Sequence, residues 1–382
     1  MKNRMQSERL QNTKRITSVI FLTYHFPPEI GGIQTRISKY VENLAKRSIR
    51  VKVLVVGHNP IVTARFQGSE VVACLGGVTH FPRSAFLVTR CVIRSKADVV
   101  HVFTGASTLL GVYALALGRV THTKCVVSFF GREDFVFPNL GSGILFRLST
   151  NLAGSIDVNS SATGASLPKK FKTKTHVLLG AAEEPRNSSL AQERRYQDEA
   201  TVLLFVGRLV ERKGVDDLLR AFAIVRSRFP RARLSIVGDG PQKKDLVKLT
   251  EQLQLSDSVD FRGTRVGAEL DQEYARCAAF VLPSKDVATD TASEGLGLAL
   301  IEASMHAKPL IGTRHGGIIE IVKQGENGIL VPPGDPTSLA EAMTEILANE
   351  DQAREMGRRG FQMAKSRFSW ERATNVLLET YA

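Results

Sequence analysis

The sequence predicts an α/β protein in which two doubly wound, Rossmann-like domains face a common cleft. Apolar, β-branched runs alternate with helical patterns from one end of the 382 residues to the other. These runs are apolar throughout, as in parallel strands that helices cover on both faces. The composition is that of a folded globular protein, with 43% hydrophobic and 23% charged residues, and the length suits two domains.

The expected strands are short runs, spread evenly over the two halves of the chain. They cover residues 16–23, 51–56, 98–103, 125–130 and 156–159, and then 201–206, 232–237, 258–261, 279–282 and 309–312. Helical spacing covers 32–46, 215–228, 241–253 and 296–305. Repeated strand–helix units imply right-handed crossovers, and these build doubly wound sheets.

A polar segment divides the chain. Residues 183–199 include Pro185 and Asn187 and hold little that could be buried, so we expect a linker there. It would separate a first domain, 16–182, from a second domain, 200–367, and residues 1–15 would form a polar tail. Residues 368–382 carry apolar side chains at helical spacing, and we expect this final helix to pack back on the first domain.

Charge is unevenly distributed between the two halves. Residues 1–180 contain 24 Lys and Arg against 8 Asp and Glu, a net charge of +16, whereas the rest nets −3. An anionic membrane surface or a phosphorylated acceptor would attract the first half. The alternative is that these cations only solvate helix faces. Nucleic acid is disfavoured as a partner, because its binding motifs and interleaved aromatic residues are missing.

The sequence also indicates where the protein works. No apolar run approaches the ~20 residues that cross a bilayer, and the polar first 15 residues are unlike a signal peptide. Four scattered cysteines show neither disulfide nor zinc-site spacing. We expect a cytoplasmic protein, held peripherally on the inner face of the membrane.

Glycine-containing turns follow several of the expected strands. They are Gly31 with Gly32, Gly207 with Gly214, Gly238 with Gly240, and Gly295 with Gly297. In open parallel sheets, ligands bind beyond the carboxyl ends of the strands, where free backbone N–H groups suit phosphates. Taken singly, each turn has an ordinary structural explanation. Their convergence from two domains predicts one binding cleft.

Charged side chains accompany these turns. Arg208 and Lys213 are a candidate pyrophosphate clamp, with a solvated loop as the alternative. Glu294 and Glu302 stand on an otherwise apolar stretch. If a helix begins near Gly295, Glu294 lies at its mouth and both carboxylates share roughly one face, since two turns take ~7.2 residues. A carboxylate in an apolar helix needs partners.

The motifs together resemble those of family 4 glycosyltransferases, which have the GT-B fold. The resemblance is carried by Phe26-Pro27-Pro28-Glu29-Ile30-Gly31-Gly32, Gly207-Arg208-Leu209, Lys213-Gly214, Pro283-Ser284, Glu294-Gly295-Leu296-Gly297-Leu298, Ile301-Glu302-Ala303 and Gly316-Gly317. It implies a retaining glycosyltransferase that moves a sugar from a UDP-, GDP- or ADP-sugar to a lipid-linked or cell-surface glycan. No cofactor or metal is expected, since an Asp-x-Asp motif is missing.

The resemblance also implies roles for matching residues. Glu294 would contact the donor sugar, Glu302 would hold the ribose, and Arg208 and Lys213 would neutralise the leaving diphosphate. Asp134 would join Glu294 as a catalytic residue. The remaining donor-binding residues would be Gly31, Gly32, Gly240, Gly263, Gly295, Gly297 and Leu298.

Departures from the family pattern concern the acceptor. Phe130 stands where the family commonly has a histidine, so acceptor handling differs, or His25 or His101 takes part. His101, at the end of an apolar strand, is expected to be structural. Two other functions stay open: a nucleotide-sugar epimerase or hydrolase with the same fold, and a non-catalytic sugar-nucleotide-binding protein.

Overall fold

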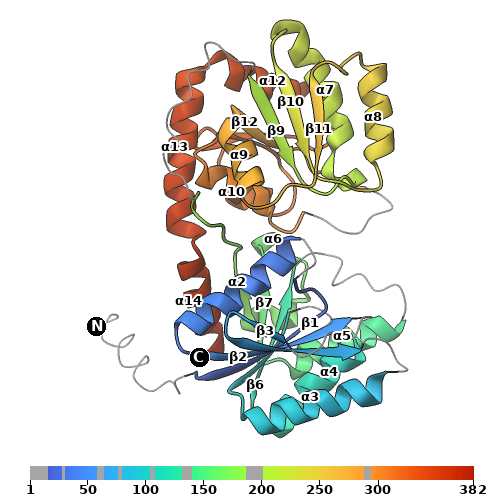
Figure 1. The fold of residues 1–382 in the computed structure, drawn as a ribbon, viewed down its shortest axis with the longest axis vertical. Coiled ribbons are helices and arrows are strands. Elements are labelled where there is room, and N and C mark those ends of the chain that lie inside the picture. Colours follow the sequence, from blue (N-terminus) through green and yellow to red (C-terminus); the bar gives the residue numbers. More distant parts are fainter. Residues whose placement is uncertain are drawn as a thin grey trace.

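The protein, seen here as a computed structural model, consists of two α/β units stacked along its long axis (Figure 1). The structure describes residues 16–27, 31–57, 64–75, 80–103, 108–130, 140–185, 201–287 and 294–382. Each unit is built on its own sheet, and nearly all neighbouring strands are parallel. The predicted α/β class with two parallel sheets is therefore confirmed.

The sheet of the first domain has eight strands in the order β3-β4-β2-β1-β5-β6-β7-β8. Its strands are β1 (Ser18–Thr23), β2 (Arg50–Gly57), β3 (Ala64–Phe66), β4 (Ser69–Leu75), β5 (Val99–Val102), β6 (Lys124–Phe129), β7 (Ser155–Val158) and β8 (Thr175–Val177). Its helices are α2 (Gly32–Lys46), α3 (Phe81–Ser95), α4 (Leu109–Val120), α5 (Leu140–Leu152), α6 (Ser161–Ala165) and the 3-10 helix η2 (Lys169–Lys174). The β3–β4 pair is antiparallel, whereas only parallel strands were predicted from the sequence.

The sheet of the second domain has six strands in the order β11-β10-β9-β12-β13-β14. Its strands are β9 (Val202–Val206), β10 (Arg233–Val237), β11 (Val259–Gly263), β12 (Ala279–Leu282), β13 (Leu310–Thr313) and β14 (Gly328–Val331). Its helices are η4 (Glu211–Lys213), α7 (Val215–Arg228), α8 (Lys243–Gln252), α9 (Ala268–Arg276), α10 (Leu298–Met305), α11 (Ile318–Ile321), α12 (Pro336–Ala348) and α13 (Glu350–Arg367).

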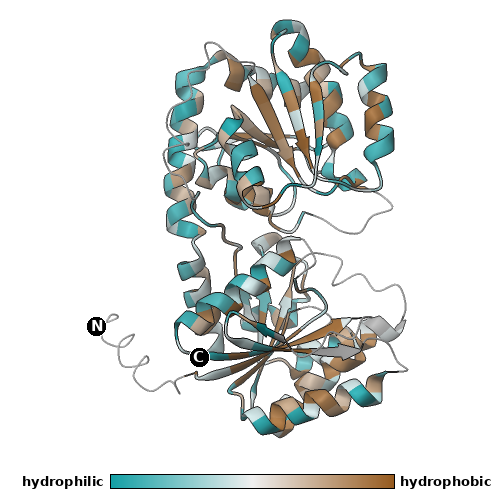
Figure 2. Cartoon of the chain, viewed as in Figure 1, coloured by the Kyte–Doolittle hydropathy of each residue, from teal (hydrophilic) through white to brown (hydrophobic). Residues whose placement is uncertain are grey.

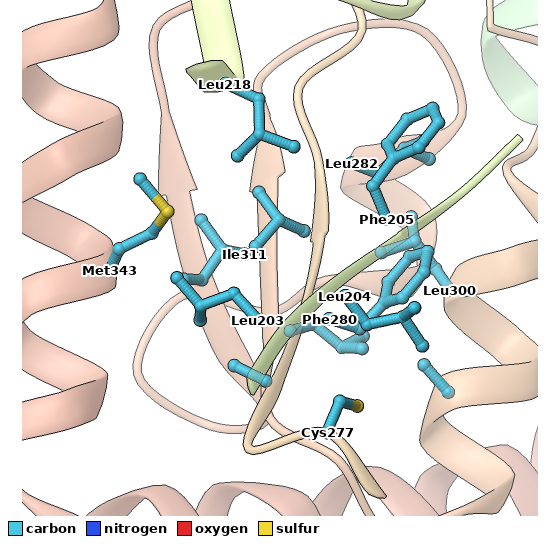
Figure 3. Close-up of a cluster of buried hydrophobic side chains, with 14 of the residues drawn as sticks. Leu203, Leu204, Phe205, Leu218, Cys277, Phe280, Leu282, Leu300, Ile311 and Met343 are labelled. Carbon is cyan, nitrogen blue, oxygen red and sulfur yellow. The ribbon is translucent and has the colours of Figure 1, made fainter. Parts of the chain in front are cut away.

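The core of the second domain explains its apolar strands. Leu203 of β9, Phe280 of β12 and Ile311 of β13 are fully buried. Leu218 of α7 and Met343 of α12, two helices that pack together, cover one face, and Leu300 of α10 covers the other (Figure 3). A strand covered on both faces has no side that could carry polar residues. This packing fixes the strand ends that bear the candidate site.

The final helix, α14 (Trp370–Tyr381), leaves the second domain and packs on the first, against α2 and β7. Trp370 meets the Tyr40 ring edge-on, with centroids 5.7 Å apart. Just before this helix, the carbonyl of Phe368 accepts a hydrogen bond from the backbone N–H of Ala182 (3.1 Å). The two segments that pass between the domains therefore lie side by side. The exact domain bounds stay a prediction.

Buried polar groups of the first domain gather where α14 docks. His101 lies 2.7 Å from both Ser128 Oγ and Tyr381 Oη, and burial, with the nearby Arg36 charge, holds its pKa well below the usual value. His101 is thus neutral and satisfied, as a structural histidine should be. Burial raises the pKa of the neighbouring Asp157 carboxyl to about 7, against the lowering effect of Arg36.

No helix in the described part of the chain combines the length and the apolar character that crossing a membrane requires. Three of the four cysteines, Cys91, Cys125 and Cys277, are buried and form no disulfide.

Candidate active site

The turn after β9 places a lysine against a buried carboxylate. Gly214 ends η4 with a φ of 65°, in the left-handed region, and a β-carbon there would collide with the carbonyl oxygen of Pro283. Only glycine allows this close approach. The approach brings Lys213 to the segment after β12, where its Nζ lies 2.5 Å from Oε2 of Glu294.

Glu294 is held from several directions. Its side chain is 8% exposed, and Ser284 Oγ donates to its Oε2 at 2.8 Å. Burial alone would raise the pKa of Glu294, but the Lys213 charge and the two hydrogen bonds outweigh it and lower the pKa below its usual value. Its backbone N–H donates to His315 Nε2 (3.4 Å), and its carbonyl accepts from Gly317 (3.0 Å). The site therefore holds a fixed, ionised carboxylate.

The expected placement of Glu294 at a helix mouth is wrong. Helix α10 begins at Leu298, and its N-cap, Gly297, has a φ of 79° that interrupts the helical path. Glu294 lies three residues before this cap, so the two carboxylates do not share a helix face. The positive φ at Gly297 allows the chain to turn there with little strain.

Glu302 lies on α10 and has its own partner. The Tyr274 hydroxyl of α9 donates to Oε2 of Glu302 at 2.7 Å. Burial raises the pKa of Glu302; the Tyr274 hydrogen bond opposes this, and the Asp271 charge adds to it. The half-buried carboxylate is thus anchored by a neutral donor, with one oxygen left for a ligand.

The other predicted donor-site residues of the second domain are less fixed. Arg208 is exposed and forms no ion pair with any described residue, so Lys213 alone of the two cations is anchored. A β-carbon at Gly240 would collide with the carbonyl oxygen of Leu209, which gives this glycine a packing role. Gly263 has a φ of 66° and open space around it. Their donor-binding roles stay predictions.

The first domain meets the site through backbone and small residues. A β-carbon at Gly295 would collide with the Phe130 carbonyl oxygen and with the Asn159 side-chain amide. Leu298 reaches the first domain, where its Cδ1 lies 2.9 Å from the β-carbon position of Gly32. Segment 295–298 is therefore seated against the first domain.

Gly31 and Gly32 begin α2 at this same edge. Gly31 is extended and serves as the N-cap residue, and its carbonyl accepts from Thr35 (3.0 Å). Gly180 lies close by, where a β-carbon would collide with Leu298. Thus Gly31, Gly32, Gly295, Gly297 and Leu298 are brought together, while their ligand contacts stay predictions.

Two contacts at the cleft were not predicted from the sequence, although Glu320 belongs to the run Glu320-Ile321-Val322 that matches the family pattern. Glu320 of α11 accepts a hydrogen bond from the backbone N–H of Ser161 (2.5 Å), at the start of α6 in the other domain. The side-chain amide of Asn159 donates to the Phe130 carbonyl oxygen. On the first-domain side, the local signal was the polar run that follows β7, where Asn159, Ser160 and Ser161 lead into a helix.

Phe130 does not present its ring to the cleft. The ring is 9% exposed and lies in the core, with the Arg36 guanidinium 5.1 Å from its centroid, and only its carbonyl faces Gly295. The Phe130 side chain is therefore part of the hydrophobic core of the first domain. Asp134, the other predicted catalytic residue, lies outside the described residues.

Residues 188–363 match the family described as glycosyl transferases group 1. A relative from Mycolicibacterium smegmatis, a GDP-mannose-dependent alpha-(1-6)-phosphatidylinositol monomannoside mannosyltransferase, is 27% identical over 92% of this chain and 95% of its own. The sulfoquinovosyl transferase SQD2 of Arabidopsis thaliana is also 27% identical, over 91% of this chain and 70% of its own.

Solved structures with the same two-domain fold cover nearly the whole chain. Anabaena HepE in complex with UDP has a TM-score of 0.74 at 20% identity and covers 95% of this chain and 99% of its own. The sucrose-phosphate synthase of Thermosynechococcus elongatus has a TM-score of 0.76 at 20% identity and covers 96% and 98%. At this identity the likeness concerns the fold.

Proposed function

We propose that this chain is a glycosyltransferase that takes a sugar from a nucleotide-sugar donor and transfers it with retention to a lipid-linked glycan acceptor. The match of residues 188–363 to the glycosyl transferases group 1, the GT-B fold and the relatives support this proposal. The GT-B fold predicted from the resemblance is confirmed, and the family match of residues 188–363 agrees with the predicted family. The observation that carries the proposal is the buried ion pair of Lys213 and Glu294 at the meeting point of the domains.

The proposed chemistry follows from where charge develops. As the bond between sugar and diphosphate breaks, negative charge grows on the diphosphate and the sugar becomes cationic. Lys213 and the N–H groups at the start of α10 are donors for the first charge. The ionised Glu294, fixed by Ser284, accepts hydrogen bonds from sugar hydroxyls, and Glu302 holds the ribose. The exposed Arg208 supplies a second cation for the diphosphate. In this mechanism no metal is required.

The acceptor is proposed from charge and from the relatives. The names of the Mycolicibacterium relative and of a similar enzyme from Corynebacterium glutamicum both specify phosphatidylinositol mannoside acceptors. The basic first half of this chain, with its net charge of +16, suits an anionic lipid surface. The relatives use GDP-mannose and HepE binds UDP, so GDP- and UDP-sugars are the first donors to test.

The central test is Glu294→Gln. This variant keeps a hydrogen-bond acceptor for Ser284 but removes the charge, and we expect sugar transfer to fall by about a thousandfold. Thermal unfolding with and without the nucleotide diphosphate checks that the fold and nucleotide binding remain. Undiminished sugar transfer by Glu294→Gln would contradict the proposed function.

Two further measurements complete the test. Transfer should persist in the presence of a chelator, and loss of activity that Mg²⁺ or Mn²⁺ restores would contradict the metal-free mechanism. When the donor is incubated with the protein but without an acceptor, its sugar should be cleaved from the nucleotide only slowly. Rapid release or interconversion of the sugar would instead favour the hydrolase or epimerase that the sequence left open.

A further inference from the structure

Three neighbouring helices of the first domain share an unusual composition. Helices α3, α4 and α5 lie side by side on one face of the sheet. They contain five arginines and no Asp or Glu. An ordinary solvated helix face mixes both signs of charge, so this layer presents charge of one sign.

The same helices expose large apolar side chains. Phe86 and Ile93 of α3 are 65% and 54% exposed, and Val120 of α4 is 77% exposed. Among the described side chains, the other large apolar ones that are exposed on these helices are Leu109, Ile144 and Leu148. Scattered apolar residues are normal on a protein surface. Their concentration on one acid-free layer is a signal for an interaction site.

Along α3, cationic and apolar side chains alternate on one face. Arg83, Phe86, Arg90 and Ile93 follow each other at spacings of three and four, and all four are exposed. Residues at these spacings are neighbours on a helix surface. Figure 2 shows α3 at the bottom of the molecule with hydrophobic and hydrophilic residues interleaved. This is the pattern of a helix that lies in a membrane interface, with arginines among headgroups and apolar groups below.

The arginines of α3 are not engaged within the described protein. Arg83, Arg90 and Arg94 form no ion pair with described residues, whereas Arg358 and Arg359 of α13 both pair with Glu355 at 2.7 Å. Unpaired arginines can bind phosphate groups without first breaking a protein contact.

We propose that the outer face of α3, α4 and α5 docks on an anionic lipid bilayer, with Phe86 and Ile93 inserted among the acyl chains and Arg83 and Arg90 bound to lipid phosphates. A second copy of the chain fits this face poorly, because two surfaces of the same charge repel each other. The inference deepens the proposed function, since it rests on a lipid-linked acceptor to give docking its purpose.

The topology orients the docked molecule. Each of these helices follows a strand that runs toward the cleft edge of the sheet, so each begins at that edge, where Gly32 and Asn159 lie. A bilayer along the helices would therefore adjoin the first-domain side of the cleft. The headgroup of an embedded acceptor could enter the cleft while its lipid remains in the bilayer.

The test compares matched pairs on two helices. Phe86→Ser with Arg90→Glu changes the α3 face, and Arg220→Glu with Ile224→Ser makes the same changes on exposed positions of α7 in the other domain. Vesicles of equal parts phosphatidylcholine and phosphatidylglycerol serve as the probe, without donor. We expect the α3 variant to bind about tenfold or more weakly and the α7 variant to bind like the parent. Binding of the parent should fall steeply with salt.

Each other outcome has a definite meaning. Equal binding by the parent and the α3 variant, or equal binding of the parent to pure phosphatidylcholine vesicles, would overturn the proposal. A change of oligomeric mass in the α3 variant, with vesicle binding retained, would assign the face to a second copy and overturn it as well. A second variant, Arg83→Glu with Arg90→Glu, keeps the apolar side chains and should also lose binding.

The proposed function fails independently of this inference. Because vesicle binding is measured without donor, a chain that binds anionic vesicles but transfers no sugar contradicts the proposed function alone. A chain that transfers sugar to a soluble acceptor but ignores vesicles contradicts the docking face alone.

Discussion

The two domains differ in where they place their buried charged groups. In the second domain, Glu294 and Lys213 form a buried pair at the cleft. In the first domain, the buried Arg36, His101 and Asp157 lie in the core where α14 docks. Among the described residues, the first domain contributes mainly backbone and an amide to the cleft. The second domain thus places an ion pair at the cleft, whereas the first domain contacts the C-terminal helix through the neutral His101.

The largest expected effect comes from Lys213→Met, which tests whether the charge pair of the second domain serves catalysis. We expect transfer to fall by about a thousandfold, or ~4 kcal/mol, because a preorganised cation for the diphosphate is lost. Burial would then dominate at Glu294 and raise its pKa. The acid limb of the pH–activity profile should move to higher pH. A profile unchanged in shape would contradict the coupling of these two residues.

The second effect concerns the buried charge of the first domain. The Asp157 carboxyl has a pKa of about 7 in the folded protein and near 4 in the unfolded chain. Its contribution to the free energy of unfolding is therefore fully present below about pH 4, where the carboxyl is protonated in both states. Stability is lost as the pH rises toward 7, by up to roughly 4 kcal/mol. Asp157→Asn removes this dependence.

The comparison of thermal midpoints at pH 5 and pH 8 measures this effect. The advantage of Asp157→Asn over the parent should grow by about 5 °C or more between the two values. An advantage that is the same at both pH values would show that Asp157 is ionised in the folded protein. Sugar transfer by this variant should be unaffected, since Asp157 lies in the core.

A third prediction tests the contact between the domains. Gly295→Ala would drive a β-carbon into the Phe130 carbonyl oxygen, and the domains would have to separate. We expect transfer to fall about ten- to a hundredfold, because misplacement of about 1 Å has effects of this size. Nucleotide binding by the second domain should persist. Gly57→Ala is the control, because a β-carbon there meets nothing within 4 Å. Parental transfer by Gly295→Ala would rule out this closed contact during catalysis.

The smallest effect is expected at Glu320, whose carboxylate accepts from Ser161 across the cleft. Removing a carboxylate from a helix start costs about 0.3–1 kcal/mol. Glu320→Ala should therefore favour domain opening by about two- to fivefold. Small-angle scattering would detect this as a larger radius of gyration without donor. A radius equal to that of the parent would mean that the contact does not hold the domains together.

The sequence predicts the second-domain site better than the first-domain side because its motifs are local. Arg208, Lys213 and Glu294 follow strands whose apolar character is unmistakable, so their position at one sheet edge follows from the fold class. The α2 and α7 helices have the predicted ends. Strands β3 and β4 escaped prediction, since a short hairpin with polar residues lacks a buried-strand pattern.

The remaining features depend on conformation or on distant contacts. The start of α10 was misplaced because the positive φ of Gly297 is a conformational choice that the residue type permits but does not impose. The contacts of Glu320 with Ser161 and of Gly295 with Phe130 depend on the relative orientation of two domains. No local periodicity encodes this orientation.

The adjacent crossings at Ala182 and Phe368 have a mechanical consequence. Because a hydrogen bond joins the two crossing segments, we expect the domains to move relative to each other mainly by rotation about this point. Parts of the domains far from it travel furthest for a given angle, and parts near it barely move. A small rotation can therefore open the far rim of the cleft while the sheet cores keep their shape. Substitutions at Ala182 or Phe368 would therefore alter how fast the cleft opens, although neither residue would contact a ligand.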